Sequence, residues 1–366
     1  MTDKVVSKEI HLTHRPTGFV TEQNFKIVQV ELPELREGEF LVRNKWMSVD
    51  PHMRIFLAQG TRSTSAYKLN RPLSGGCVGQ IIVSKSDKFK EGDYVLADNG
   101  WREYWISNDN VNNIKNVTVI DPKIGSIQHF LGLLGITGFT AYVGLFKIGG
   151  LREGMDTVFV SAAAGGVGSV ACQIAKIKAC HVVGSAGTED KVKWLLDDVK
   201  IDYAFNYKKL GESINAQPSI NENNVMSSEL KRACPNGIDL YFDNVGGKHL
   251  ESAIDNMSLF GRIVLCGATS VYDSIATTSP NSRLPSGPSN LSLAISNRLR
   301  LQGFVYSDHN NMLTDFYQSM SSWISDDKIR LKETIYYGLE SAPKAFVGLF
   351  KGENIGRTLV RVGSEI

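Results

Sequence analysis

The sequence has few cysteines, and their spacing forms no recognisable metal or redox motif. Five cysteines are scattered over 366 residues, without a Cys-x-x-Cys pair. An odd and scattered set is a poor disulfide framework and is typical of a reducing compartment. A structural zinc site needs four closely spaced ligands, so we expect no metal.

The chain also lacks an excess of either charge. Lys and Arg total 40 and Asp and Glu total 38, which leaves a net charge of +2. This balance gives no global electrostatic reason to bind nucleic acid or an anionic membrane. The first residues lack the apolar core of a signal peptide. We therefore expect a cytoplasmic protein, with the nucleus as a second location.

One segment, residues 124–146, contains no Asp, Glu, Lys or Arg. By charge alone it could span a bilayer. It also contains several glycines and polar side chains, and its apolar residues Phe139, Tyr142, Val143 and Phe146 recur at helical spacing. We interpret it as a buried segment of a globular protein.

The rest of the chain divides into two kinds of pattern. Its length predicts two domains at about 150 residues each. Residues 1 to about 123 contain short β-rich runs separated by Gly and Asp turns, which predict a small barrel-like β domain. Afterwards strands alternate with helical patterns, which predicts a parallel, doubly wound α/β sheet. Its expected strands begin near Thr157, Cys180, Tyr203, Asp239, Arg262 and Leu299.

A glycine-rich turn, Ser161-Ala-Ala-Ala-Gly-Gly-Val-Gly-Ser169, follows the first of these strands and precedes an amphipathic helix. Glycines there allow a tight turn and close approach of the backbone to a pyrophosphate. The helix N-terminus then offers free N–H groups to the phosphate charge. The strand before and the helix after favour a dinucleotide site over a structural turn.

The end of the second strand bears on the choice between NAD and NADP. An NAD site usually has an acid there for the ribose, and this strand ends Val183-Gly-Ser-Ala-Gly without one. Thr188 reads as a helix cap, with Glu189 and Asp190 complementing the helix dipole. Lys191 lies in the same first turn, where a cation is disfavoured. A nearby 2′-phosphate explains it, and so does a solvated surface lysine.

Ligands of a doubly wound sheet lie beyond the carboxyl ends of its strands. Tyr272 is the most interesting titratable residue in that set, at the start of a Ser- and Pro-rich loop over residues 272–290. A neutral tyrosine can donate a hydrogen bond to a developing oxyanion. An ordinary loop-packing aromatic is the alternative interpretation.

Several motifs together resemble the zinc-independent medium-chain dehydrogenase/reductases, most closely the prostaglandin reductase and alkenal double-bond reductase branch. They keep the family order over nearly the whole chain: Val42–Arg54, Gly100–Tyr104, Val160–Ser169, Gly184–Lys191, Ala204–Lys208, Tyr241–Gly247, Gly261–Ala268 and Lys351–Arg357. The resemblance implies a GroES-like β-barrel-type domain, residues 1–134 and 323–366, and a Rossmann domain, residues 135–322.

The resemblance also implies NADPH-dependent reduction of the carbon–carbon double bond of α,β-unsaturated ketones or aldehydes, by hydride transfer to the β-carbon. Lys191 and Tyr207 then hold the 2′-phosphate, Asn354 contacts the nicotinamide end, and Tyr272 assists at the substrate oxygen. The full set of expected cofactor residues is Ala162, Gly165, Gly166, Val167, Gly168, Gly187, Lys191, Tyr207, Asn244, Gly267 and Asn354.

Some points stay open at this stage. Arg357 stands where the family commonly has Lys, and its charge is a second candidate for the 2′-phosphate. A quinone reductase on the same fold, a non-catalytic NADPH-binding sensor or structural protein, and a zinc alcohol dehydrogenase are the rival functions. Because the family is often dimeric, a homodimer is a further expectation.

Overall fold

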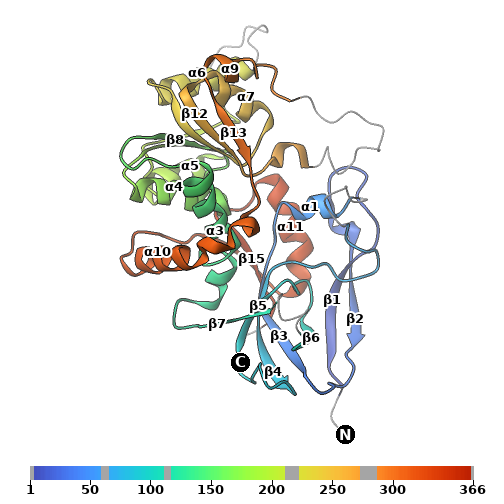
Figure 1. The fold of residues 1–366 in the computed structure, drawn as a ribbon. Helices are drawn as coiled ribbons and strands as arrows, with labels where there is room; N and C mark the ends of the chain where they lie inside the picture. The colour runs from blue at the N-terminus through green and yellow to red at the C-terminus, as the bar shows by residue number, and fades with distance from the viewer. Residues whose placement is uncertain (1–3, 59–65, 111–116, 211–221, 273–286, 364–366) are drawn as a thin grey trace.

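The computed structural model describes residues 4–58, 66–110, 117–210, 222–272 and 287–363. These residues form two bodies, one above the other in Figure 1. The parallel-sheet body contains a six-stranded sheet. The mixed-sheet body contains a seven-stranded sheet, in which six strands follow one path and the seventh lies beside it, and a separate two-stranded ribbon. The predicted fold class, a doubly wound sheet with a separate β domain, is confirmed.

The parallel sheet has the order β10-β9-β8-β11-β12-β13, and every neighbouring pair is parallel. The strand order reverses between β8 and β11, which creates the crevice where such sheets bind ligands. The strands are β8 (Thr157–Val160), β9 (His181–Ala186), β10 (Tyr203–Asn206), β11 (Ile238–Asp243), β12 (Met257–Leu265) and β13 (Arg300–Gly303).

Successive residues of each central strand pack on opposite faces of this sheet. In β8, Val158 and Val160 join one buried cluster and Phe159 joins the other. A strand buried on both faces reads as a continuous apolar run, which is why these segments were recognisable in the sequence. The helices are α3 (Ile136–Val143), α4 (Gly166–Ile177), α5 (Glu189–Asp197), α6 (Glu222–Ala233), α7 (Gly247–Asp255), α9 (Leu293–Ser296) and α10 (Leu313–Ser325).

The mixed-sheet body combines both ends of the chain. Its main sheet runs β14-β15-β3-β4-β5-β7, with β6 also paired to β3, and β1 pairs with β2. The limits of the two domains, 1–134 with 323–366 and 135–322, remain a prediction. The elements are β1 (Val6–Leu12), β2 (Phe25–Glu31), β3 (Glu39–Ser48), α1 (Met53–Phe56), β4 (Cys77–Ser84), β5 (Tyr94–Ala97), β6 (Tyr104–Asn108), β7 (Val117–Ile120), β14 (Glu333–Tyr337), α11 (Ala342–Lys351) and β15 (Arg357–Arg361).

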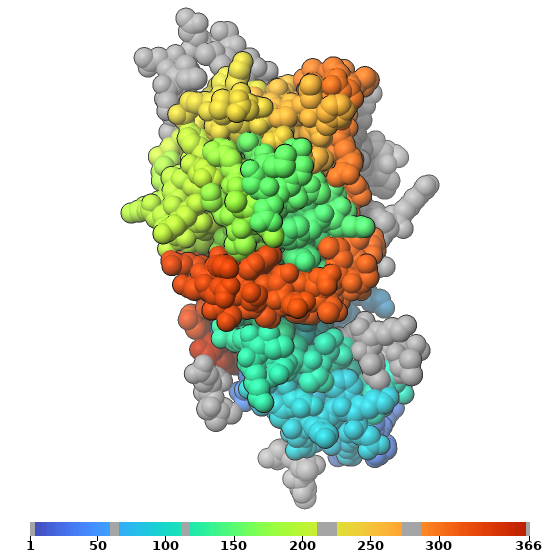
Figure 2. Space-filling model, turned by 60° about the vertical axis from the view of Figure 1, so that its left-hand side comes forward, coloured from blue at the N-terminus to red at the C-terminus, as the bar shows by residue number. Residues whose placement is uncertain are grey.

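The uncharged segment, residues 124–146, lies where the two bodies meet. Its Leu131 and Phe139 belong to one buried cluster with Val78 and Leu359 of the mixed-sheet body and Val160 of the parallel sheet. Figure 2 shows α10, in orange-red, between the green surface of the parallel-sheet body and the blue-green surface of the other. Among the described residues, no helix has the length and apolar character needed to cross a membrane.

Candidate functional site

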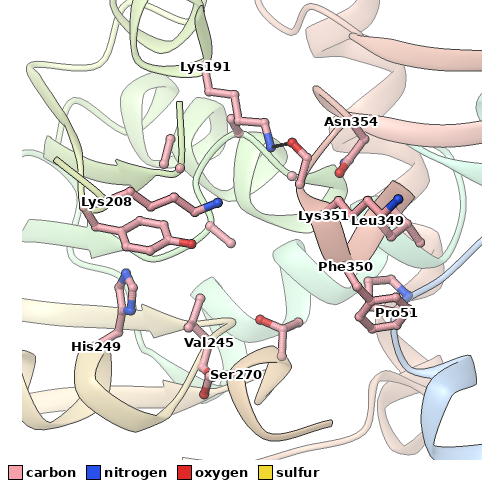
Figure 3. Close-up of a pocket in the computed structure, with 18 of the residues that line it drawn as sticks. Pro51, Lys191, Lys208, Val245, His249, Ser270, Leu349, Phe350, Lys351 and Asn354 are labelled. Atoms are coloured by element: carbon pink, nitrogen blue, oxygen red, sulfur yellow. Dashed lines mark hydrogen bonds between the residues drawn. The ribbon is translucent and has the colours of Figure 1, made fainter. Parts of the chain in front are cut away.

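A cavity of about 1030 Å³ lies between the two bodies. Its floor is built from the carboxyl ends of the parallel strands, and the α11–β15 connection with Val49 and Pro51 closes it from the other body (Figure 3). Among the described residues that line it there are several cations and no Asp or Glu. A cavity of this composition suits a polyanionic ligand.

The glycine turn forms the centre of the floor. Ala162 adopts a left-handed conformation, with φ of +47°, and Gly165 is the N-cap of α4. A Cβ at Gly168 would collide with the Ala162 carbonyl, so only glycine permits this turn. The first N–H groups of a helix have no intrahelical partner, and here no acidic side chain occupies the first turn. These groups are available to a pyrophosphate.

The predicted residues of the turn differ in what they face. Ala162, Gly165 and Gly166 line the cavity. Val167 and Gly168 are not among its lining residues, so their part is to shape the turn and the start of the helix. The glycine turn therefore fits the phosphates of a dinucleotide, which was the ligand expected from its sequence.

At one end of the cavity, Gly187, Lys191, Tyr207 and Lys208 lie together. A Cβ at residue 187 would lie 3.3 Å from Cε of Lys208 and 3.4 Å from the Tyr207 hydroxyl, so glycine leaves this corner open. Burial, and then the charge of Lys208, lower the pKa of Lys191. When two ammonium groups lie near each other and no carboxylate lies between them, a bound dianion stabilises both charges. We call this corner the cationic end.

Thr188 caps α5 as the sequence predicted, because its hydroxyl accepts a hydrogen bond from the Lys191 N–H at 3.4 Å. The Lys191 side chain leaves the helix surface and crosses the cavity, where its ammonium donates to the Gly352 carbonyl at 2.8 Å (Figure 3). Glu189 instead accepts from the Asn206 side chain, outside the cavity. The first turn of α5 thus places the Lys191 ammonium in the cavity.

Asn354 approaches the same cavity from the mixed-sheet body. Its side-chain amide donates to the Gly356 carbonyl at 3.0 Å, and the Gly356 N–H donates to the Ala164 carbonyl of the glycine turn at 2.7 Å. Gly165 and Gly356 form an isolated parallel bridge. The structure therefore brings Asn354 beside the glycine turn, from which it is separated by nearly two hundred residues of sequence.

Asn244 and Gly267 are not among the residues that line the cavity. The Asn244 side chain donates to the Ser161 carbonyl at 2.8 Å, which ties the end of β11 to the end of β8. Buried Asp243 accepts hydrogen bonds from the N–H groups of Val245 and Gly246. These bonds shape the turn whose residues Val245–Gly247 do line the cavity.

Tyr272 lies beside this turn, half-buried and outside the lining of the cavity. Its hydroxyl accepts a hydrogen bond from the Ala268 N–H at 3.3 Å. Burial raises the pKa of Tyr272, so the hydroxyl keeps its proton at neutral pH. Its neighbour Val271 lines the cavity. Most of the predicted loop over residues 272–290 lies outside the described residues.

The expectation that Arg357 offers its charge to the 2′-phosphate is wrong. Its guanidinium forms a buried ion pair with Asp50, and its Nε donates to the Leu131 carbonyl at 2.7 Å. Burial alone would raise the pKa of Asp50, but Arg357 holds it down at about 2. Arg357 therefore joins β15 to the segment after β3, and its charge is neutralised there.

Two cavity residues were missed in the sequence. Lys208 follows the predicted Tyr207 directly, and two adjacent polar residues after a strand of a parallel sheet were a usable signal. His249 is 5% exposed and its ring packs edge-on against Tyr207, with centroids 4.8 Å apart. Its buried Nε2 has no hydrogen-bond partner among the described residues, and burial lowers its pKa to about 4. A single histidine within α7 gave no sequence signal.

Within the described part of the chain, no group of three or more His, Cys, Asp or Glu residues is arranged to hold a metal ion. All five cysteines are free thiols. Burial raises the pKa of every one of them, and to about 12 in Cys77, Cys234 and Cys266. These thiols are packing residues at neutral pH.

Comparison with known proteins gives two family matches. Residues 8–116 match a family described as the N-terminal domain of oxidoreductases. Residues 166–325 match a family described as zinc-binding dehydrogenase. The two matches fall on the mixed-sheet body and the parallel-sheet body respectively.

Three similar proteins extend over nearly the whole chain. Prostaglandin reductase 1 of Bos taurus is 39% identical, with 94% of this chain and 95% of that protein covered. The NADP(+)-dependent 2-alkenal reductase of Nicotiana tabacum is 35% identical and covers 100% of both. The crystal structure of CurA from Vibrio vulnificus in complex with NADPH superposes with a TM-score of 0.84, at 33% identity, over 98% of this chain and 100% of that one.

Proposed function

Because the chain belongs to the zinc-independent medium-chain dehydrogenase/reductase family, in the branch of the prostaglandin and alkenal reductases, we propose that it reduces the carbon–carbon double bond of α,β-unsaturated ketones and aldehydes with NADPH. The observation that carries the proposal is the cationic end. Lys191 and Lys208 lie close enough there for the charge of one to lower the pKa of the other, and the described lining residues include no acid. That arrangement favours a 2′-phosphate over the bare ribose hydroxyl of NADH.

The residues present fit the cofactor along the length of the cavity. We propose that the N–H groups at the start of α4 bind the pyrophosphate. Lys191, Tyr207 and Lys208 would bind the 2′-phosphate, and Gly187 leaves room for it. Asn354 lies on the opposite wall, where we propose a contact near the nicotinamide end. When bound, NADPH supplies the hydride that adds to the β-carbon of the substrate.

The protein's own contribution is to position the substrate and stabilise charge on its carbonyl oxygen. Holding two reactants in a closed cavity aligns the reacting carbons and excludes water. We propose that the Tyr272 hydroxyl donates a hydrogen bond to the carbonyl oxygen as negative charge develops there. Its raised pKa keeps this proton in place at neutral pH. The bond that the hydroxyl accepts from Ala268 leaves its own proton free to point elsewhere.

The test is NADPH consumption over straight-chain 2-alkenals, aryl-substituted enones and quinones, with product analysis by mass spectrometry. We expect saturated aldehydes and ketones in which the carbonyl group is retained. Turnover restricted to quinones would favour the quinone reductase alternative. NADPH binding without turnover of any substrate in the panel would favour a sensor or structural role.

We also propose that the chain forms a homodimer through β13, which pairs with β12 and is otherwise an edge among the described strands. Exposed apolar side chains surround it: Leu259 (58%), Phe260 (65%), Ile295 (81%) and Val305 (56%). An edge strand related by a twofold axis can pair with its own copy. Light scattering of wild type and Phe260→Asp tests this, because a monomer in both would reject the interface.

The free thiols support our proposal of a cytoplasmic location. Cell fractionation with an antibody against the chain tests it. Recovery in a secreted or membrane fraction would contradict it.

A further inference from the structure

The segment from Gly352 to Arg357, here called the strap, crosses the cavity wall between α11 and β15 and includes Asn354. It belongs to the mixed-sheet body in sequence and pairing. Its contacts, however, reach the parallel-sheet body at two points, and these contacts show how Asn354 is held.

One anchor of the strap lies at its far end. The Gly356 N–H donates to the Ala164 carbonyl at 2.7 Å, and φ of +70° at Gly356 requires glycine. On the side of its own body, the Thr334 hydroxyl exchanges two hydrogen bonds of 2.9 Å with the backbone of Ile355. The second half of the strap is thus fixed by backbone contacts.

The other anchor is Lys191. Gly352 ends α11 in a left-handed conformation, with φ of +73°, and so turns its carbonyl away from the helix. The Lys191 ammonium donates to that carbonyl at 2.8 Å (Figure 3). The lysine is half-buried in this position. The N–H groups of Gly352 and Glu353 bond back to α11, and Lys191 adds the link from this first half of the strap to the parallel-sheet body.

We propose that Lys191 is a positioning residue for Asn354: by holding Gly352 it keeps the strap, and Asn354 with it, against the cofactor cavity even when no 2′-phosphate is present. This role rests on the proposed function and adds to the 2′-phosphate contact. An ammonium group has three N–H donors. Lys191 can therefore bind the Gly352 carbonyl and a phosphate oxygen at the same time. Through Lys191 and Gly352, the adenosine end of the cofactor would be linked to Asn354.

Lys208 lines the same end of the cavity as Lys191, but among the described residues its side chain makes no hydrogen bond to the strap. If Lys191 only binds phosphate, its loss matters with NADPH and not with NADH. If it also positions the strap, its loss matters with both cofactors. Loss of Lys191, unlike loss of Lys208, should then loosen the backbone of the strap.

The first measurement is hydrogen exchange of the backbone amides of residues 352–357, in the absence of cofactor and substrate. We expect Lys191→Met to accelerate exchange there about tenfold. Lys208→Met keeps the wild-type rate, and Lys191→Arg, which retains a donor, restores it. Wild-type exchange in Lys191→Met would overturn the proposal. Since no turnover is involved, this result is independent of whether enones are substrates.

The second measurement is kcat/KM with NADH. We expect Lys191→Met to lose about tenfold, as for one charge-assisted hydrogen bond. Exposed Lys193 on the same helix provides the matched control, and Lys193→Met should behave as wild type. If kcat/KM with NADH is unchanged in Lys191→Met, Lys191 binds the phosphate only and does not position the strap. A wild-type enzyme inactive on every enone would instead contradict the proposed function and leave the exchange result standing.

Discussion

Two parts of the cavity lining are built in different ways. The cationic end comes from one stretch of chain, residues 187–208, and its side chains converge because β9 and β10 are adjacent parallel strands. The second part is Arg357, which lines the cavity and whose guanidinium bonds to Asp50 and Leu131, far away in sequence. A part built from one stretch of chain can be changed by mutation without disturbing distant segments. The part around Arg357 connects three distant segments, so its bonds also stabilise the fold.

The largest effect is expected on the free energy of unfolding, when Arg357 is replaced. Arg357→Met leaves the buried Asp50 carboxylate without its partner, and breaking a buried ion pair costs about 3–5 kcal/mol. Urea unfolding should show this loss. The double variant Asp50→Asn/Arg357→Met removes both charges and should recover a large part of it. Equal stability of wild type and Arg357→Met would show that the ion pair does not stabilise the fold.

Tyr272→Phe tests the proposed chemistry at the substrate oxygen. Removing one donor to an oxyanion costs about 2.7–4 kcal/mol in other enzymes, so turnover should fall by about two to three orders of magnitude. The Kd for NADPH should stay within about twofold of wild type, as measured by quenching of tryptophan fluorescence. Wild-type turnover of an enone would remove Tyr272 from the site.

At the cationic end, Lys191→Met should weaken NADPH binding by about 2 kcal/mol, since hydrogen bonds to charged groups are worth about 1.5–3 kcal/mol. Calorimetry with adenosine 2′,5′-bisphosphate isolates the phosphate contribution, and 5′-AMP is the matched ligand without the 2′-phosphate. Equal losses for both ligands would mean that Lys191 does not recognise the 2′-phosphate.

The smallest effect concerns His249, whose pKa burial lowers from 6.5 to about 4. The unfolded chain binds a proton below pH 6.5 and the folded chain only below about pH 4, so stability falls as pH falls through this window. The slope is at most about 1.4 kcal/mol per pH unit. His249→Phe should reduce the slope of unfolding free energy between pH 6 and 4.5. A slope unchanged in this variant would assign it to other groups.

The sequence predicted those features that local physics determines. The Thr188 cap, the glycine turn and the buried strand around Phe159 each depend on neighbours within a few residues. The charge of Arg357 was assigned wrongly because its partner, Asp50, is 307 residues away. Lys191 was recognised as unusual within its helix, but its bond to Gly352 depends on how the two bodies meet. No periodicity in the sequence contains that information.

The pairing of β15 has a consequence for synthesis of the chain. β15 lies between β14 and β3 in the sheet, so β3 (Glu39–Ser48) receives one of its neighbours from residues more than 300 positions later in the chain. The strands of the parallel sheet leave the ribosome well before that partner does. Part of the β3 edge in the mixed-sheet body therefore stays unpaired until residues 357–361 have been synthesised. A chain that stops short of Arg357 would keep that edge permanently and be prone to aggregate through it.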